Sequence, residues 1–361
     1  MSKTPLYQQI RHMIRSKIMS GELRPKDRVP SEQEIMEEYM VSKITVKNAL
    51  SALADEGLIV RIQGKGTFVS PEIELMDRTK PLEQTRGQQD GNYIGFIIPT
   101  LKTKVIQRLL DYVEYYINEA GYQLVLHITR ESSLKESRAI SELIQSKEIK
   151  GFIVFPTEDE TYNESLLRLS LDKFPLVLID RYLRNIDTYR ITADNFGGVY
   201  EAVSLLLKKD HKQIALISPD KTNTSIEDRT SGFERAYVDN GMLIDKSLWC
   251  HVPIHLLRNG DPLAYITDFL YHHSHISAAL TLTAEMTNLT HQGLHNLDRN
   301  SDIKLISFDD PDLLGIPFIS QDEQTMARSA VDILIKQIQG EYDPLKIVVP
   351  VSLKHVDPEL L

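Results

Sequence analysis

The chain has 361 residues, 42% hydrophobic and 25% charged, which is the composition of an ordinary globular protein with room for two or three domains. Its one cysteine, Cys250, excludes an intrachain disulfide, and the chain has no apolar signal segment and no run of roughly 18 apolar residues, so we expect a cytoplasmic protein without membrane insertion. The net charge of −10 would disfavour a nucleic-acid partner if it were evenly spread, but residues 1–70 carry +3 and the remainder carries −13.

Three helices are predicted in the first 57 residues. Residues 5–20 have a helical apolar face that ends near Gly21, and a capping box at Ser31 and Glu34 starts the second helix. Ser42 starts the third helix, which ends at Gly57. Its inward arc comprises Val46, Ala49, Leu50 and Leu53, and its outward arc comprises Lys43, Ile44, Lys47, Asn48 and Ser51. Two short helices joined by the turn 40–42 form a helix-turn-helix, whose second helix can enter a DNA major groove.

A β-hairpin is predicted to follow, with strands at residues 58–63 and 67–69. The turn Gly64–Gly66 contains two glycines, which let the backbone approach a phosphate closely. Arg61, Gln63 and Lys65 would place polar and cationic groups on this wing, and we assign Lys65 to a phosphate contact that positions the protein.

The segments Pro30–Glu34, Val41–Lys47, Leu53–Ile59 and Gly64–Val69 closely resemble the GntR family of bacterial regulators over about 65 residues. The resemblance implies a winged-helix homodimer bound to a palindromic operator in double-stranded DNA. Gln33 stands where the family usually has a DNA-contacting arginine, and Lys43 and Lys47 replace commoner arginines, so the operator sequence does not follow from the family. The candidate DNA-binding residues are Gln33, Ser42, Lys43, Ile44, Thr45, Lys47, Gln63, Gly64, Lys65 and Gly66.

Residues 71–91 are polar, contain two prolines and two glycines, and are predicted to be a linker. From residue 92 onward, short apolar runs alternate with amphipathic stretches, the pattern of a doubly wound parallel α/β domain. The predicted strands are 93–98, 123–128, 151–155, 176–179, 214–217, 278–282 and 305–308. About 270 residues exceed one core, so we expect two lobes split near Tyr189. Lobe 1 would contain about 92–190 and 316–340, and lobe 2 about 191–315 and 341–361.

Polar side chains follow many of these strands, at the edge where open α/β sheets bind ligands. Their mixture of carboxylates, guanidinium groups and hydroxyls favours a sugar, whose hydroxyls both donate and accept hydrogen bonds. The segments Asp180–Arg181, Asp194–Gly198, Arg229–Phe233 and Ser307–Asp310 resemble the LacI/GalR effector domain, which is similar to periplasmic sugar-binding proteins. The candidate effector-binding residues are Thr100, Lys102, Arg130, Arg181, Tyr182, Arg229, Glu285 and Asp310.

In that resemblance Arg181, Arg229 and Asp310 correspond to effector ligands, while Asp194 and Asn195 are either ligands or structural. The family commonly has Asn-Asp where this chain has Ala284 and Glu285. The combination of the two domains resembles regulators of the arabinose-repressor type. We therefore expect a repressor of carbohydrate-utilisation genes, whose DNA binding is modulated by a sugar between the lobes.

Two alternatives compete with this interpretation. His272, His273 and His275, with the helical pair His291 and His295, have spacings that allow a metal-responsive regulator. The polar strand ends allow a sugar-processing enzyme with an accessory DNA-binding module. No catalytic motif accompanies them, and we expect Cys250 beside His251 to be a buried thiol, so we predict no enzyme activity, no cofactor and no bound metal.

Overall fold

The computed structural model of the protein divides into the units Met1–Gln89 and Asp90–Leu361. Its described residues are 6–19, 22–55, 57–62, 65–70, 92–145, 148–158, 163–184, 186–220, 223–300, 302–342 and 344–355. The predicted linker 71–91 therefore lies outside the described residues, as do Gly21, Gln63 and Gly64. Among the helices that the structure describes, none combines the length and the apolar character needed to cross a bilayer.

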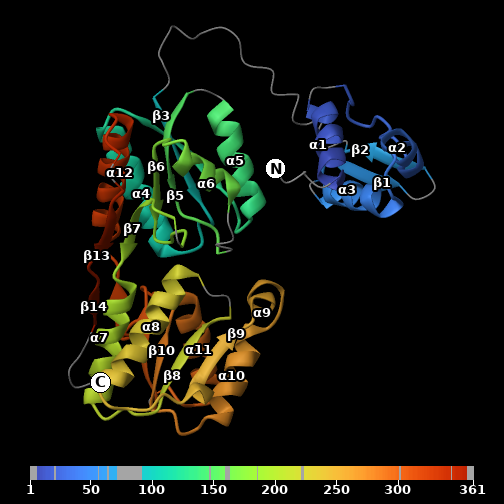
Figure 1. Cartoon of the computed structure of the whole chain (residues 1–361). Coiled ribbons are helices and arrows are strands. Elements are labelled where there is room, and N and C mark those ends of the chain that lie inside the picture. The colour runs from blue at the N-terminus through green and yellow to red at the C-terminus, as the bar shows by residue number, and fades with distance from the viewer. Residues whose placement is uncertain are drawn as a thin grey trace. The chain divides into compact units, whose positions relative to one another are not determined.

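The N-terminal unit contains the helices and the hairpin predicted from the sequence (Figure 1). Its elements are α1 (Leu6–Met19), α2 (Glu32–Tyr39), α3 (Lys43–Asp55), β1 (Ile59–Ile62) and β2 (Gly66–Val69). The capping box is confirmed: the backbone N–H of Glu34 donates to Ser31 Oγ (3.2 Å), and that of Ser31 donates to Glu34 Oε2 (2.6 Å). Met40 takes a left-handed conformation (φ 48°) that ends α2 and turns the chain into α3.

The core of this unit packs the inward arc of α3 against α1, α2 and the hairpin. Val46 and Leu53 are fully buried, and Ile14 and Ile35 contact the same cluster. β1 and β2 pair antiparallel, with Ile59 opposite Val69 and Ile62 opposite Gly66. The apolar arc of α3 thus fixes the orientation of the helix and leaves its opposite face outside the core.

Lobe 1 of the C-terminal unit is a parallel sheet with strand order β13-β7-β6-β5-β3-β4. Helices α4 and α12 cover one face, and α5 and α6 cover the other (Figure 1). Its elements are β3 (Tyr93–Ile98), α4 (Lys104–Glu119), β4 (Gln123–Ile128), α5 (Ser133–Gln145), β5 (Ile149–Val154), α6 (Glu164–Leu171), β6 (Leu176–Ile179), β7 (Tyr189–Ala193), α12 (Glu323–Ile338) and β13 (Lys346–Val349).

Lobe 2 repeats this order as β14-β12-β11-β10-β8-β9, with β14 antiparallel and the other strands parallel. Helices α7 and α8 pack together on one face, and α10 and α11 lie on the other. Its elements are α7 (Asn195–Lys208), β8 (Ile214–Pro219), α8 (Thr224–Asp239), the 3-10 turn Lys246–Leu248, β9 (Trp249–Val252), α9 (Ile254–Asn259), α10 (Pro262–His272), β10 (Ala278–Thr281), α11 (Ala284–Asn296), β11 (Lys304–Phe308), β12 (Phe318–Ser320) and β14 (Ser352–Lys354). The predicted two-lobed, doubly wound fold is confirmed.

The strand pairing corrects the lobe boundaries expected from the sequence. β7 extends to Ala193 in lobe 1, β12 pairs with β11 in lobe 2, and β13 pairs with β7 in lobe 1. The chain therefore crosses between lobes at Asp194, at 321–322 and at 350–351. The segments around β12 and β13 are too short for apolar periodicity to assign them to a sheet, which is why the expected boundaries were wrong.

The close packing of α7 on α8 requires a glycine at position 232. A Cβ atom at Gly232 would lie 2.3 Å from the carbonyl oxygen of Phe196 on α7, so the helices would have to separate. We expect Gly232→Ala to lower the free energy of unfolding by about 1–3 kcal/mol, measured by chemical denaturation.

Ser231→Ala is the matched control, because Ser231 is an exposed neighbour on α8 and its loss should cost less than about 0.5 kcal/mol. Equal stability of the two variants would contradict this contact between the helices.

Candidate functional site

The outward face of α3 is built from side chains that the core does not need. Lys43, Ile44, Lys47 and Asn48 are exposed, and Ile44 keeps 73% of its surface accessible. The structure thus places Lys43, Ile44 and Lys47 together on one accessible surface, as predicted. Asn48 was not among the predicted binding residues, although the helical spacing had already placed it on this arc.

Ser42 and Thr45 have a local role at the start of α3. The backbone N–H of Thr45 donates to Ser42 Oγ (3.3 Å), and the two hydroxyl groups lie 2.9 Å apart. On α2, the side-chain amide of Gln33 donates to Glu37 Oε1 (3.1 Å) in an exposed position. These contacts occupy polar groups that were predicted to face DNA.

The wing presents Lys65 and Gly66 at its tip, and both are exposed. Gly66 has a φ of 120°, a backbone conformation that favours glycine. Arg61 on β1 lies 3.8 Å from Glu32 on α2, an ion pair that ties the wing to the helix-turn-helix. Gln63 and Gly64, also predicted to bind DNA, fall outside the described residues.

In the C-terminal unit, Arg229 on α8 organises a buried polar cluster with Asn195, Asp309 and Gln321, which we call the Arg229 cluster. Its guanidinium group donates to Asn195 Oδ1 (2.8 Å) and to the carbonyl oxygen of Leu282 (2.7 Å). It also lies 3.9 Å from Asp309 Oδ2 and 3.5 Å above the ring of Phe308. Arg229 is only 4% exposed, so these groups replace the water that the cation loses.

The carboxylate in this cluster is Asp309, the residue before the predicted Asp310. The side-chain amide of Gln321 donates to Asp309 Oδ1 (2.8 Å). Burial raises the pKa of Asp309, and Arg229 and the hydrogen bond from Gln321 oppose that shift; burial also lowers the pKa of Arg229. Asn195 Nδ2 and Gln321 Oε1 are buried without a hydrogen-bond partner among the described residues. The cluster therefore retains a donor and an acceptor for a further polar group.

Asp310 instead forms an ion-pair network with the start of α4. Asp310 Oδ2 lies 3.3 Å from Lys104 Nζ and 3.7 Å from Arg108 Nη2. Lys104 also pairs with Asp312 (2.7 Å), and Arg108 with Glu323 (3.6 Å). Since α4 belongs to lobe 1 and residues 309–312 to lobe 2, this network connects the lobes.

On the lobe 1 side, Arg181 follows β6 and packs 5.0 Å from the ring of Phe155. Its guanidinium group donates to the carbonyl oxygen of Pro156 (3.0 Å) and to Glu131 Oε1 (3.4 Å). Burial raises the pKa of Glu131, and Arg181 opposes that shift. Glu131 also accepts a hydrogen bond from the backbone of Glu158 (2.6 Å), so this carboxylate, which was not predicted, holds the loops after β4, β5 and β6 together.

Two further contacts connect the lobes directly. Ser225 Oγ donates to the carbonyl oxygen of Asp180 (3.1 Å), and the backbone N–H of Tyr182 donates to Thr224 Oγ1 (3.2 Å). The ring of Tyr182, predicted to pack on a sugar, lies 3.7 Å from the guanidinium carbon of Arg190. One face of that ring is therefore already covered by a cation.

The remaining predicted effector residues differ in their surroundings. Thr100 Oγ1 accepts a hydrogen bond from the backbone of Lys102 (3.1 Å), and Lys102 and Arg130 are exposed. Glu285 is also solvent-exposed, yet desolvation by the protein around it and the charge of Glu158 raise its pKa, while Lys102 lowers it. A further ion pair across the lobes links Glu158 to Arg258 on α9 (3.7 Å).

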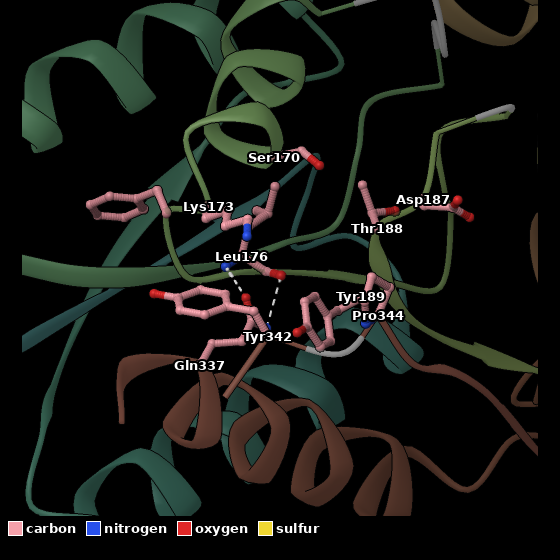
Figure 2. A pocket seen from close by; sticks show the side chains of 10 residues that line it. Ser170, Lys173, Leu176, Asp187, Thr188, Tyr189, Gln337, Tyr342 and Pro344 are labelled. Carbon is pink, nitrogen blue, oxygen red and sulfur yellow. Dashed lines mark hydrogen bonds between the residues drawn. The ribbon is translucent and has the colours of Figure 1, made fainter. Parts of the chain in front are cut away.

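A small cavity lies at the other end of the lobe 1 sheet, at the amino ends of β6 and β7 (Figure 2). Its volume is about 120 Å³, and Gln337 forms two hydrogen bonds to the backbone of Leu176 beside it (3.0 and 3.1 Å). The lining residues are Ser170, Lys173, Phe174, Leu176, Asp187, Thr188, Tyr189, Gln337, Tyr342 and Pro344. None of them was predicted to bind a ligand.

Histidine spacing allowed a metal site, and Cys250 stands beside His251 in the sequence. Within the described ranges, no three His, Cys, Asp or Glu side chains are grouped to hold a metal ion. Cys250 is buried, which raises the pKa of its thiol to about 12, and the Nδ1 atom of His251 lies 2.9 Å from Ser218 Oγ. The thiol is therefore protonated at neutral pH.

Comparison with known proteins agrees with this architecture. Residues 6–69 match the model of the family described as bacterial regulatory proteins, gntR family. The arabinose metabolism transcriptional repressor of Halalkalibacterium halodurans is 29% identical over 242 residues, which are 66% of this chain and 62% of that protein. The chain thus spans about three fifths of the length of the curated arabinose repressors that it matches.

Solved structures of low sequence identity share the fold of the C-terminal unit. The complex of the transcriptional regulator CelR with cellobiose has a TM-score of 0.64 and 18% identity, and covers 87% of this chain and 90% of that chain. A regulatory protein of the LacI family from Chloroflexus aggregans has a TM-score of 0.62 and 17% identity. The match covers 72% of this chain and 96% of that protein's chain. Residues 6–69 therefore match the gntR family model, and the C-terminal unit has the two-lobed fold also seen in a LacI-family regulator.

Proposed function

We propose that this chain is a sequence-specific transcription regulator, a cytoplasmic repressor of carbohydrate-utilisation genes that binds an operator through α3 and the wing. The observation that carries the proposal is the exposed face of α3, where Lys43, Ile44 and Lys47 stand clear of the core within a GntR-family domain. A helix of this kind can enter the major groove, and a cationic wing can contact the phosphates. The similarity to the arabinose repressor of Halalkalibacterium halodurans supports the same function.

The effector in this proposal is a small sugar bound between the lobes, near the Arg229 cluster and Arg181. Buried donors and acceptors from both lobes suit hydroxyl groups, and Asn195 Nδ2 and Gln321 Oε1 still need partners. Asp309 takes the place predicted for Asp310, because Asp309 faces Arg229. The CelR complex with cellobiose, which has the same fold, supports a sugar as the effector.

Binding of the sugar would act by changing the relative placement of the lobes. Ion pairs such as Lys104 with Asp310 and Glu158 with Arg258 connect the lobes, and each depends on their separation. A tenfold change in operator affinity needs only about 1.4 kcal/mol of preference of the sugar for one lobe arrangement. Rearranging a few partly exposed ion pairs involves free energies of this size.

The proposed assembly is a homodimer on a palindromic operator. Residues 1–70, the DNA-binding head, carry a net charge of +3, which gives limited attraction to DNA. Two heads on two half-sites would therefore supply useful affinity. Lobe 1 also exposes apolar side chains on α4, where Tyr115 is 55% exposed, and on its edge strand β4, where Leu126 is 38% exposed. A second copy would cover such an edge.

The function is tested by mobility shift of a palindromic DNA site near the gene for this chain, with a panel of pentoses, hexoses and their phosphates. We expect specific binding that one sugar changes. Binding that only a chelator abolishes would favour a metal-responsive regulator, and turnover of a sugar without DNA binding would favour an enzyme.

Lys65 should act on affinity without acting on sequence preference. We expect Lys65→Ala to weaken binding to all DNA sequences alike and to reduce the slope of log affinity against log salt concentration by about 0.9 per head. Fluorescence anisotropy across a salt series measures the slope. Lys17→Ala removes a lysine of α1 that pairs with Glu22 (3.2 Å), and it should leave the slope unchanged. An unchanged slope for Lys65→Ala would place the wing away from DNA.

Arg229→Ala should abolish the response of operator binding to sugar while leaving the affinity for DNA without sugar intact, because the DNA-binding head is a separate unit. Arg235→Ala is the matched control on the same helix: its guanidinium group is exposed and pairs with Asp239 (3.0 Å), so the sugar response should persist.

Calorimetric titration of the sugar and mobility shift of the operator measure both properties. Because Arg229 is the counter-charge of buried Asp309, circular dichroism must show that the variant is folded. Loss of both sugar and operator binding in a misfolded variant would assign Arg229 to folding instead of to the effector.

A further inference from the structure

We propose that α3 recognises a half-site containing adenine·thymine pairs, in which Asn48 binds an adenine and Ile44 contacts the methyl group of a thymine. The inference rests on the proposed DNA-binding function and specifies the bases that the domain reads. It is carried by two exposed side chains, one turn apart on the same face of α3.

The packing of the core does not explain why an apolar residue stands at position 44. The buried arc of α3 consists of other residues, including Val46 and Leu50, and 73% of the surface of Ile44 is accessible in the first turn of the helix. An apolar side chain there gains free energy only when another apolar group covers it. The apolar group that base edges present in the major groove is the C5 methyl of thymine.

Asn48 lies four residues further along α3 and is exposed. In the described part of the chain its side chain takes part in no hydrogen bond, unlike Gln33, whose amide donates to Glu37. A carboxamide presents one donor side and one acceptor side, which match N7 and the N6 amino group of adenine in a bidentate pair. Guanine offers two acceptors at the same edge, so it fits a lysine better than an asparagine.

The spacing of the two side chains is compatible with neighbouring base pairs. Four residues of helix advance by about 6 Å, and successive base pairs are separated by about 3.4 Å, so the two contacted bases lie within about two base pairs. Lys43 and Lys47 flank Ile44 on the same exposed face, with no carboxylate partner among the described residues. These cations can hold the helix against phosphates or guanines beside the adenine·thymine pairs.

Selection of random double-stranded DNA by the full chain tests the inference, because such a selection finds the preferred half-site among all sequences. The wild-type chain should enrich half-sites with an adenine and a thymine within about two base pairs of each other. Asn48→Ala should lose the preference at the adenine and weaken binding of the wild-type site roughly tenfold.

Asn48→Asp should shift the same position towards cytosine, whose N4 amino group donates to a carboxylate. A residue that only supports the fold would not exchange one base preference for another. Both side chains are exposed, so the melting temperatures of the variants should match that of the wild type.

Replacing the selected thymine by deoxyuridine removes only the methyl group. We expect wild-type affinity to fall roughly three- to fivefold, and Ile44→Ala to bind the two duplexes equally well. Ile44→Val, which keeps a branched apolar side chain, should still distinguish them.

Two results would overturn the inference in different ways. If the wild type enriches a defined site but the variants at 44 and 48 weaken all sequences alike, α3 does not read these bases and the regulator function stands. If the folded wild-type chain enriches no sequence, the proposed DNA-binding function fails, and this inference fails with it.

Discussion

The parallel direction of the strands is the constraint on which the C-terminal unit depends. In each lobe the carboxyl ends of the parallel strands meet at one edge, and the chain passes between the sheets at Asp194, 321–322 and 350–351, beyond such strand ends. The polar loops of both lobes therefore gather where the chain also crosses. In the proposed function, a ligand at this place would contact both lobes and the segments that join them, so the same edge would bind the sugar and transmit its presence.

Arg229 shows how the protein stabilises a charge at this edge. Taking the guanidinium group out of water is costly, and the Leu282 carbonyl, Asn195, Asp309 and the ring of Phe308 together offset that cost. Hydrogen bonds and ring contact hold the guanidinium group in one orientation before any ligand arrives. By contrast, the ion pairs of Lys104, Arg108 and Asp310 are partly exposed, so the lobe rearrangement that we propose would break them at little cost in free energy.

Sequence patterns predicted the elements whose formation depends on local interactions. The capping box at Ser31, the turn before α3 and strands such as β3 and β4 follow from hydrogen bonds and apolar spacing between near neighbours. β12 and β13 are too short for periodicity to assign them to a sheet, and β13 pairs with β7, which is far away in the sequence. Asp309 and Asp310 are adjacent carboxylates, and only the packed structure determines which one faces Arg229. Asn48 was on the predicted outward arc, but only the structure shows that its side chain forms no hydrogen bond among the described residues.

The head and the two-lobed unit are separate units, so their proposed cooperation is a claim about linked equilibria. If sugar changes operator affinity, operator must change sugar affinity by the same factor. The most direct measurement is calorimetric titration of the active sugar into the free protein and into the protein saturated with operator. We expect dissociation constants that differ by the factor by which saturating sugar changes operator affinity. Identical constants in the two titrations would contradict the proposed coupling between sugar and operator.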